Sequence, residues 1–273
     1  MESRDFTDAF ATLGHPGRLA VFRLLMRFAP QGVRPTEIAE ALTLKPNTLS
    51  HHLSELEAAG LIGVDRQGRS LFYSVRLDQV ADLVGYLVND AGRGRPDIAA
   101  NLPTLAPPGV TDRPRNVLFI CSGNSARSIF AEAILRDAGR GRFAAFSAGT
   151  KPGSQVNSRT ALVLARANLD VSGLRAKHVS EFETPGAPVM DFVFTVCDKA
   201  ASEDCAPWPG QPMTAYWGVP DPVKATGDDA QKTAAFSRAY DELRRRITAF
   251  TALPFADLGK TALQHHLDTI GLS

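Results

Sequence analysis

The chain is poor in cysteine and has no long hydrophobic run. Three cysteines stand among its 273 residues, and an odd number of thiols does not fit the disulfide framework of small secreted domains. No apolar run approaches the roughly 18 residues of a membrane helix, and the opening MESRDF leads into no apolar leader segment. We therefore expect a cytoplasmic protein without a membrane partner, whose few thiols serve chemistry.

A large excess of charge of either sign is also absent. The formal net charge is +1 and 44% of the residues are hydrophobic, so the chain can fill sizeable cores and is long enough for two domains. Residues 92–115 hold five prolines and three glycines without a helical or strand period, which is typical of a semi-extended linker. We predict one domain over residues 1–91, this linker, and a second domain over residues 116–273.

The most informative motif is NVLFICSGNSARS, residues 116–128. A strand-like apolar run ends at Cys121, and a helical pattern begins at Ser128. A loop between a buried strand and a helix N-terminus points successive N–H groups and the positive end of the helix dipole at one place. The motif therefore predicts an oxyanion-binding loop. Its residues are Cys121, Ser122, Gly123, Asn124, Ser125, Ala126, Arg127 and Ser128.

Three side chains of this loop are candidates for catalysis. The N–H groups that hold an anion also stabilise a thiolate, so we expect a lowered pKa and a nucleophilic sulfur at Cys121. Arg127 offers a planar set of donors for two oxyanion oxygens, and Ser128 can donate a hydrogen bond to the sulfur. Gly123 and Asn124 are residue types that tolerate the left-handed backbone of a tight loop. The alternative is a buried structural cysteine with a surface arginine.

After residue 115, strand-like and helical segments alternate. Strands are predicted at 116–120, 143–148 and 192–196, and helices from residue 128, over 157–168 and over 230–250. Such alternation predicts an α/β domain with a doubly wound parallel sheet, helices on both faces, and ligands at the carboxyl ends of the strands.

Cys197 and Cys205 are the other two thiols. Cys197 closes the strand-like run 192–196, and Cys205 follows on a polar loop. Each could be an inert apolar side chain. Three thiols without a histidine at ligand spacing make a poor zinc site, so no metal is predicted. Their joint placement favours a thiol relay, in which Cys197 attacks the sulfur of Cys121 and Cys205 then attacks Cys197.

The Cys-x5-Arg-Ser loop directly after the first strand of this domain resembles the low-molecular-weight tyrosine phosphatase fold. The three thiols resemble the relay of the thiol-dependent arsenate reductases built on that fold. The resemblance implies that Cys121 attacks arsenate held by Arg127, and that Cys197 then expels arsenite. It further implies a Cys197–Cys205 disulfide that thioredoxin or a small-molecule thiol reduces, with no tightly bound cofactor.

Asp221 is the candidate general acid. Asp221-Pro222 stands where this fold carries its acid on a loop over the thiol, and a leaving oxygen must be protonated. Asp-Pro is also an ordinary turn initiator. Phosphatases of the fold usually continue with tyrosines that wall a pocket for an aromatic substrate, whereas Val223 and Lys224 follow here. Because Val223 and Lys224 replace these tyrosines, a small inorganic oxyanion is favoured as the substrate over phosphotyrosine.

Residues 1–91 show helical patterns followed by a hairpin pattern. Helices are predicted over 6–13, 19–26, 35–42, 46–59 and 77–88, with a β-hairpin over 61–75. The pair 35–42 and 46–59 is typical of a helix–turn–helix, whose outward polar side chains reach base edges while basic residues at the hairpin tip reach phosphates. The candidate DNA-binding residues are Lys45, Asn47, Thr48, Ser50, His51, His52, Arg66 and Arg69.

The stretch LKPNTLSHHLSELEAAGLI with its hairpin resembles the winged-helix repressors of the ArsR type. The resemblance implies double-stranded DNA as a partner, and the apolar face of helix 77–88 predicts a homodimer. Charge gives weak support, because residues 1–91 carry nine basic and eleven acidic side chains. The paired cysteines through which many such repressors sense arsenite are missing from TEIAEALTL. A winged helix kept only for protein contacts is the alternative.

Three functions remain open on the sequence. The first is an arsenate reductase fused to a transcriptional regulator of an arsenic response. The second is a DNA-binding tyrosine phosphatase in which Cys197 and Cys205 are bystanders. The third is a repressor that senses redox state or an oxyanion through its C-terminal half.

Overall fold

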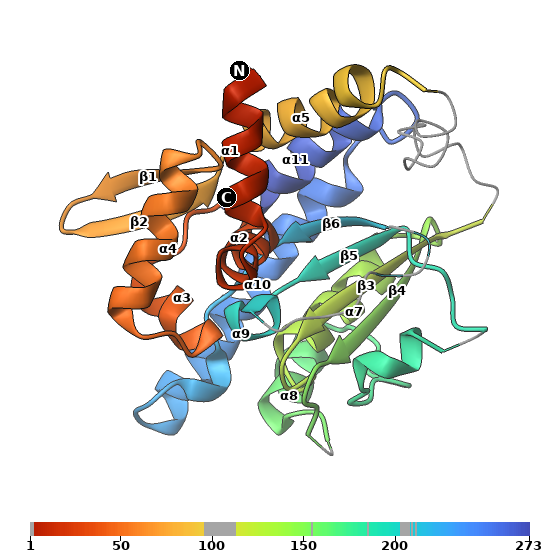
Figure 1. Ribbon diagram of the computed structural model, residues 1–273. Helices are drawn as coiled ribbons and strands as arrows, with labels where there is room; N and C mark the ends of the chain where they lie inside the picture. Colours follow the sequence, from red (N-terminus) through yellow and green to blue (C-terminus); the bar gives the residue numbers. More distant parts are fainter. Residues whose placement is uncertain are drawn as a thin grey trace. The chain divides into compact units, whose positions relative to one another are not determined.

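The computed structural model describes residues 3–95, 113–153, 155–184, 186–202, 208, 210 and 212–273. The chain divides into two compact units, Met1–Thr104 and Leu105–Ser273, and each is described by itself (Figure 1). The predicted boundaries at residues 91 and 116 stay predictions, because most of the linker lies outside the described residues. None of the helices in the described part is long and apolar enough to cross a membrane.

The first unit is a helical domain with a two-stranded wing. Its elements are α1 (Ser3–Leu13), α2 (Pro16–Phe28), α3 (Pro35–Leu42), α4 (Pro46–Ala58), β1 (Ile62–Gln67), β2 (Ser70–Val75), α5 (Leu77–Gly85) and the π-helical turn η1 (Tyr86–Ala91). The core contains Ile38 of α3 together with Leu49 and Leu56 of α4, all at most 2% exposed. The predicted helix–turn–helix and hairpin are confirmed.

Local chemistry sets the ends of these elements. His15 caps α2, since its Nδ1 accepts hydrogen bonds from Gly17 N at 3.1 Å and Arg18 N at 3.4 Å. Helix α3 ends at Thr43 in the left-handed conformation, with φ 53°. Strands β1 and β2 pair antiparallel with Gln67 opposite Ser70, so Gly68 and Arg69 form the two-residue tip, where Gly68 has φ 64°.

The second unit is built on a four-stranded sheet. Its elements are β3 (Arg115–Cys121), α7 (Arg127–Ala138), β4 (Phe143–Gly149), α8 (Ser158–Arg166), η2 (Val179–Phe182), β5 (Phe192–Thr195), α9 (Asp198–Ser202), β6 (Met213–Tyr216), η3 (Pro222–Lys224), α10 (Asp229–Thr251) and α11 (Lys260–Leu272). The strand order is β4-β3-β5-β6, and every pairing is parallel. The predicted fold class is confirmed, although β6, α9 and α11 were not predicted.

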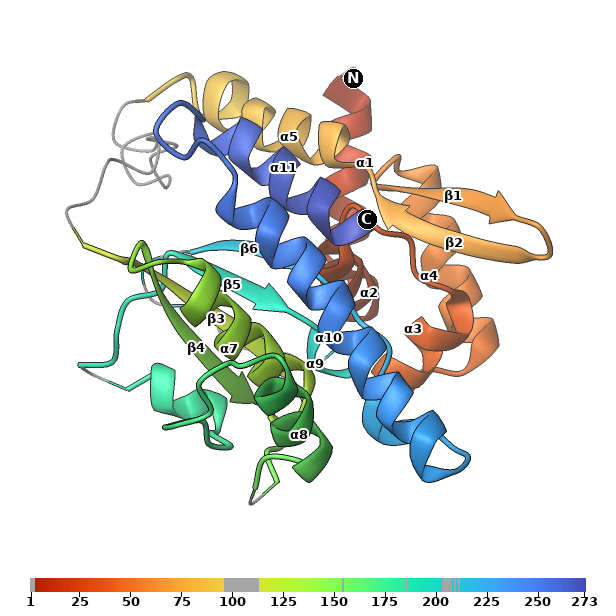
Figure 2. The same ribbon diagram turned by 180° about the vertical axis from the view of Figure 1, so that it is seen from behind.

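Aromatic side chains fill one face of this sheet. The rings of Phe194 and Trp217 stack at 3.9 Å, and Phe250 of α10 meets both rings at 5.2 and 5.8 Å. Helices α7 and α10 lie over this face (Figure 2). On the opposite face, Phe146 of β4 contacts Phe182 of η2 at 5.6 Å. Because neighbouring side chains on a strand alternate, both faces of the sheet are covered.

Parallel pairing brings three loops to one edge of the sheet. Cys121 ends β3 opposite Gly149 of β4. After β5, Val196 N donates to Ile120 O at 2.8 Å, and after β6, Val219 N donates to Val196 O at 3.2 Å. The oxyanion loop, Cys197 and the loop of Asp221 therefore leave the sheet together, at the carboxyl edge where α/β proteins place their ligands.

Candidate functional site

The oxyanion loop closes tightly around the sulfur of Cys121. Ser128 Oγ lies 2.9 Å from Cys121 Sγ, and Asn124 N donates to the same sulfur at 3.2 Å. Helix α7 starts at Arg127, directly behind the loop, so its N-terminus faces the sulfur. The sequence motif placed these residues correctly on a strand, a loop and a helix end.

Asn124 holds the shape of this loop. Its φ of 42° is left-handed, as its residue type suggested, whereas Gly123 does not adopt a positive φ. The fully buried amide of Asn124 donates to Ser128 Oγ and Ser147 Oγ, both at 2.9 Å, and accepts from Lys177 N at 2.7 Å. A left-handed asparagine with all three bonds made is a rigid corner.

Arg127 and Asp221 form an ion pair across the mouth of the loop. Arg127 Nη2 lies 2.9 Å from Asp221 Oδ2, with 10% and 24% of the two side chains exposed. Arg127 Nη1 also donates to Val219 O at 3.1 Å. The structure thus brings together the residue predicted to bind the oxyanion and the residue predicted to act as the acid, which are 94 positions apart in the sequence.

Cys197 lies beside the oxyanion loop. Its Sγ is 3.6 Å from Ser122 Oγ and accepts from Ala200 N at 3.4 Å. Cys121 and Cys197 are both free thiols and both buried. Cys205 lies outside the described residues, so its predicted role stays a prediction.

Burial raises the pKa of the Cys121 thiol, and the nearby Cys197 adds to this effect. Hydrogen bonds from Ser128 and the charge of Arg127 act in the opposite direction but do not outweigh burial. The expectation of a lowered pKa is therefore wrong for this arrangement. Its physical reason is burial, since Cys121 is only 2% exposed and the charged thiolate would lose its contact with water.

The DNA-contact candidates divide into an exposed set and one exception. Lys45, Asn47, Thr48, Ser50, His51, Arg66 and Arg69 are exposed. His52 is 6% exposed and lies inside the domain, with its ring centroid 5.1 Å from that of His15. Burial first, and then His15, His51 and Arg18, lower the pKa of His52. We therefore withdraw His52 from the proposed DNA contacts.

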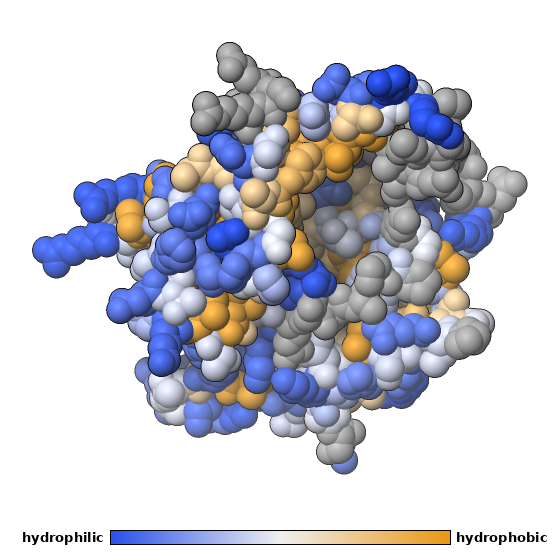
Figure 3. Space-filling model, in the orientation of Figure 1, coloured by the Kyte–Doolittle hydropathy of each residue, from blue (hydrophilic) through white to orange (hydrophobic). Residues whose placement is uncertain are grey.

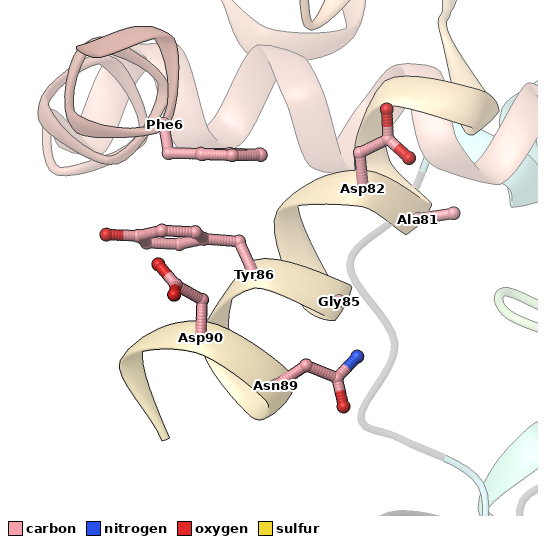
Figure 4. A pocket seen from close by; sticks show the side chains of 7 residues that line it. All are labelled: Phe6, Ala81, Asp82, Gly85, Tyr86, Asn89 and Asp90. Carbon is pink, nitrogen blue, oxygen red and sulfur yellow. The ribbon is translucent and has the colours of Figure 1, made fainter. Parts of the chain in front are cut away.

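A hollow of about 560 Å³ lies at the C-terminal end of the first unit. The rings of Phe6 and Tyr86 stack at 4.3 Å on its wall, with Asp90 beside Tyr86 (Figure 4). Its lining residues are Phe6, Ala81, Asp82, Gly85, Tyr86, Asn89 and Asp90. Of these described residues none is basic, so the hollow does not suit an oxyanion.

Both halves of the chain match models of known domain families. Residues 13–65 match the model of a helix-turn-helix domain. Residues 116–264, more than half of the chain, match the model of the low molecular weight phosphotyrosine protein phosphatases. The chain belongs to this phosphatase family. It is a fusion of such a domain with an N-terminal helix-turn-helix domain.

Similar members of the family are arsenate reductases. That of Halalkalibacterium halodurans is 31% identical over 134 residues, which are 49% of this chain and 93% of that protein. That of Bacillus licheniformis is 31% identical over 137 residues, 50% of this chain and 94% of that protein. A solved arsenate reductase in the phosphate binding state shares 24% identity at a TM-score of 0.42, over 50% of this chain and 97% of that chain.

The raised pKa of Cys121 predicts a pH profile for its alkylation. A thiol that ionises above its ordinary pKa is mostly protonated at neutral pH, so its reactivity with iodoacetamide should still be rising above pH 8.5. Quantifying the alkylated Cys121 peptide by mass spectrometry in reduced protein measures this profile. Ser128→Ala, which removes a donor to the sulfur, should move the profile to higher pH. A plateau already reached at pH 7 would contradict the described arrangement.

Proposed function

We propose that the C-terminal domain reduces arsenate to arsenite through a relay of its three thiols. The observation that carries the proposal is the position of Cys197, whose sulfur lies 3.6 Å from Ser122 Oγ of the oxyanion loop. A hydrolytic phosphatase needs only the first cysteine of such a loop. A second free thiol against the loop supports redox chemistry, and similarity to curated arsenate reductases supports arsenate as the substrate.

The first step joins Cys121 to arsenic. The Cys121 thiolate attacks arsenate held by the loop amides and Arg127, and a sulfur–arsenic bond forms while an oxygen leaves as water. The Asp221 carboxylate, which lies 2.9 Å from Arg127 of the loop, takes the proton that the Cys121 thiol loses and passes it to the leaving oxygen. Because Asp221 is ion-paired with Arg127 before substrate enters, binding of the oxyanion must share or release this arginine.

The second step transfers two electrons. The Cys197 thiolate attacks the sulfur of Cys121, and the electron pair of the broken sulfur–arsenic bond reduces As(V) to As(III), which leaves as arsenite. Cys205 then attacks Cys197, restoring the Cys121 thiolate and forming a Cys197–Cys205 disulfide. A thioredoxin-like dithiol or a small-molecule thiol returns this disulfide to two thiols and is itself oxidised.

The surroundings of Asp221 favour a small oxyanion over phosphotyrosine. Val223 and Lys224, which follow in η3, are exposed and carry no aromatic ring. Neither of these two residues offers a ring on which an aromatic substrate could stack. The family's phosphatase activity is therefore the second candidate, and its support is the intact set of Cys121, Arg127 and Asp221.

We further propose that the first unit binds duplex DNA as a homodimer and regulates an arsenic response. Helix α4 exposes the polar side chains expected of a recognition helix, and Arg66 and Arg69 stand on the exposed wing. Leu77, Val84 and Leu87 of α5 and η1 are 43–46% exposed, in keeping with the apolar surface over α5 (Figure 3). An apolar helix face of this kind supports a two-fold contact.

Replacing each thiol separates the reductase from the phosphatase. Cys121→Ser, Cys197→Ser and Cys205→Ser should each lower steady-state arsenite production by more than about a hundredfold, because each breaks the relay at a different sulfur. Hydrolysis of p-nitrophenyl phosphate should respond to Cys121→Ser alone. If Cys197→Ser and Cys205→Ser produce arsenite at the native rate with excess thioredoxin, the relay is wrong.

The wing arginines give a test of DNA binding that needs no operator. The double variant Arg66→Ala/Arg69→Ala should weaken binding to a mixed-sequence duplex and reduce the slope of log K against log salt by roughly 2, about one per lost phosphate contact. Fluorescence anisotropy across a salt series measures the slope. Arg140→Ala/Arg166→Ala, which removes two exposed charges from the other unit, is the matched control. An equal slope in both double variants would exclude the wing from the contact.

A further inference from the structure

A buried ion pair lies behind the oxyanion loop and takes no part in the steps above. Lys177 Nζ donates to Glu132 Oε2 at 3.1 Å, with 8% and 4% of the two side chains exposed. Lysine and glutamate are rarely buried to this extent, because removing their charges from water is costly unless close partners compensate. Apolar side chains would fill the same space at lower cost. The position of the pair next to the loop suggests a task for its charges.

Hydrogen bonds lead from this pair to the reactive sulfur in one direction. Ser147 Oγ gives its single hydrogen to Glu132 Oε2 at 2.5 Å, so toward Asn124 Nδ2, at 2.9 Å, it can only accept. The other hydrogen of Asn124 Nδ2 goes to Ser128 Oγ, also at 2.9 Å. The hydroxyl hydrogen of Ser128 is then left for Cys121 Sγ, 2.9 Å away.

Lys177 enters this network through its backbone as well. Its N–H donates to Asn124 Oδ1 at 2.7 Å, which fixes which end of the amide faces Ser147. Its carbonyl accepts from Gly149 N at 2.8 Å, which ties it to the end of β4. One residue therefore orients the asparagine of the loop with its main chain and the final carboxylate with its side chain.

We propose that Lys177 is a positioning residue. Its ammonium group holds Glu132 as the last acceptor in this series of hydrogen bonds, and the series in turn directs the Ser128 hydroxyl at the Cys121 sulfur. Lys177 does not touch the substrate, and the inference rests on the oxyanion loop of the proposed function. Arg136 binds the other oxygen, Glu132 Oε1, at 2.6 Å from a position 38% exposed. Glu132 Oε2 accepts the last hydrogen bond of the series, and its partners among the described residues are Lys177 and Ser147.

The direction of these hydrogen bonds matters because a thiolate is stabilised by groups that donate hydrogen bonds to it. A Ser128 hydroxyl that points at the sulfur stabilises the ionised form, while one that accepts from the thiol stabilises the neutral form. Burial already opposes ionisation of Cys121, so the directed hydroxyl counts more here than in an exposed site. Without the ammonium, Glu132 Oε2 loses its buried charged donor at 3.1 Å, and the carboxyl group is no longer held as an acceptor for the Ser147 hydroxyl.

The test is the reactivity of Cys121 in full-length, reduced Lys177→Met, whose side chain is close in length but neutral. Iodoacetamide alkylation of the Cys121 peptide is followed by mass spectrometry against pH, with and without inorganic phosphate. At pH 7 we expect alkylation to fall about threefold to tenfold, the effect of losing one ordinary hydrogen bond, because the Ser128 hydroxyl stays in place but is no longer directed at the sulfur. The profile should shift to higher pH, and half-protection should need more phosphate. Lys232→Met, the same exchange on α10, should behave as the native protein.

Two further variants separate this role from simple loosening of the fold. Glu132→Gln/Lys177→Met keeps a carbonyl oxygen for Ser147 without a buried charge, so it should regain part of the native reactivity. Ser147→Ala interrupts the chain one bond nearer the sulfur and should reproduce the loss even if Lys177→Met does not fold. Native alkylation and phosphate protection in folded Lys177→Met or in Ser147→Ala would overturn the proposal, as would a double variant less reactive than Lys177→Met. Failure of phosphate to protect the native protein would instead refute the oxyanion loop itself.

Discussion

Parallel pairing of β3 with β5 is the constraint on which the rest of the site depends. Parallel strands end at the same edge of a sheet, so the pairing of Ile120 with Thr195 brings Cys121 and Cys197 out side by side. Phe250 of α10 packs against Phe194 and Trp217, and these contacts hold the helix against the sheet next to this edge. Cys121 is the last residue of β3 and Cys197 follows the end of β5 by two residues, so the proposed relay starts from two thiols that the sheet already brings to one edge.

Burial and charge act against each other at the nucleophile. Removing Cys121 from water favours the thiol, and the site counters this with the N-terminus of α7, the Ser128 hydroxyl and Arg127. Arg127 is paired with Asp221 in this structure, and under the proposed mechanism an incoming oxyanion competes with Asp221 for its guanidinium. The buried network of Asn124, Ser147 and Glu132 keeps the loop rigid while this occurs.

The sequence predicted those features that depend on local pattern. The loop motif located Cys121, Arg127 and Ser128, and strand–helix alternation gave the parallel sheet. The prediction of His52 as a DNA contact was wrong because it followed the polarity of the side chain and not its helical spacing. His52 stands three residues after Leu49 and four before Leu56, on the buried stripe of α4. Lys177 could not be predicted, because its burial depends on Glu132 and Asn124, which lie 45 and 53 positions away. The four-residue β6 is too short to show a period.

The central claim is that the domain passes two electrons from its own thiols to arsenate. The most direct measurement is a single turnover, in which reduced protein meets arsenate without an external thiol. Arsenite is then assayed and the disulfides are mapped by mass spectrometry. The account predicts about one arsenite per chain and Cys197 joined to Cys205, since each disulfide supplies two electrons. Three free thiols and no arsenite, in protein that still hydrolyses p-nitrophenyl phosphate, would contradict it.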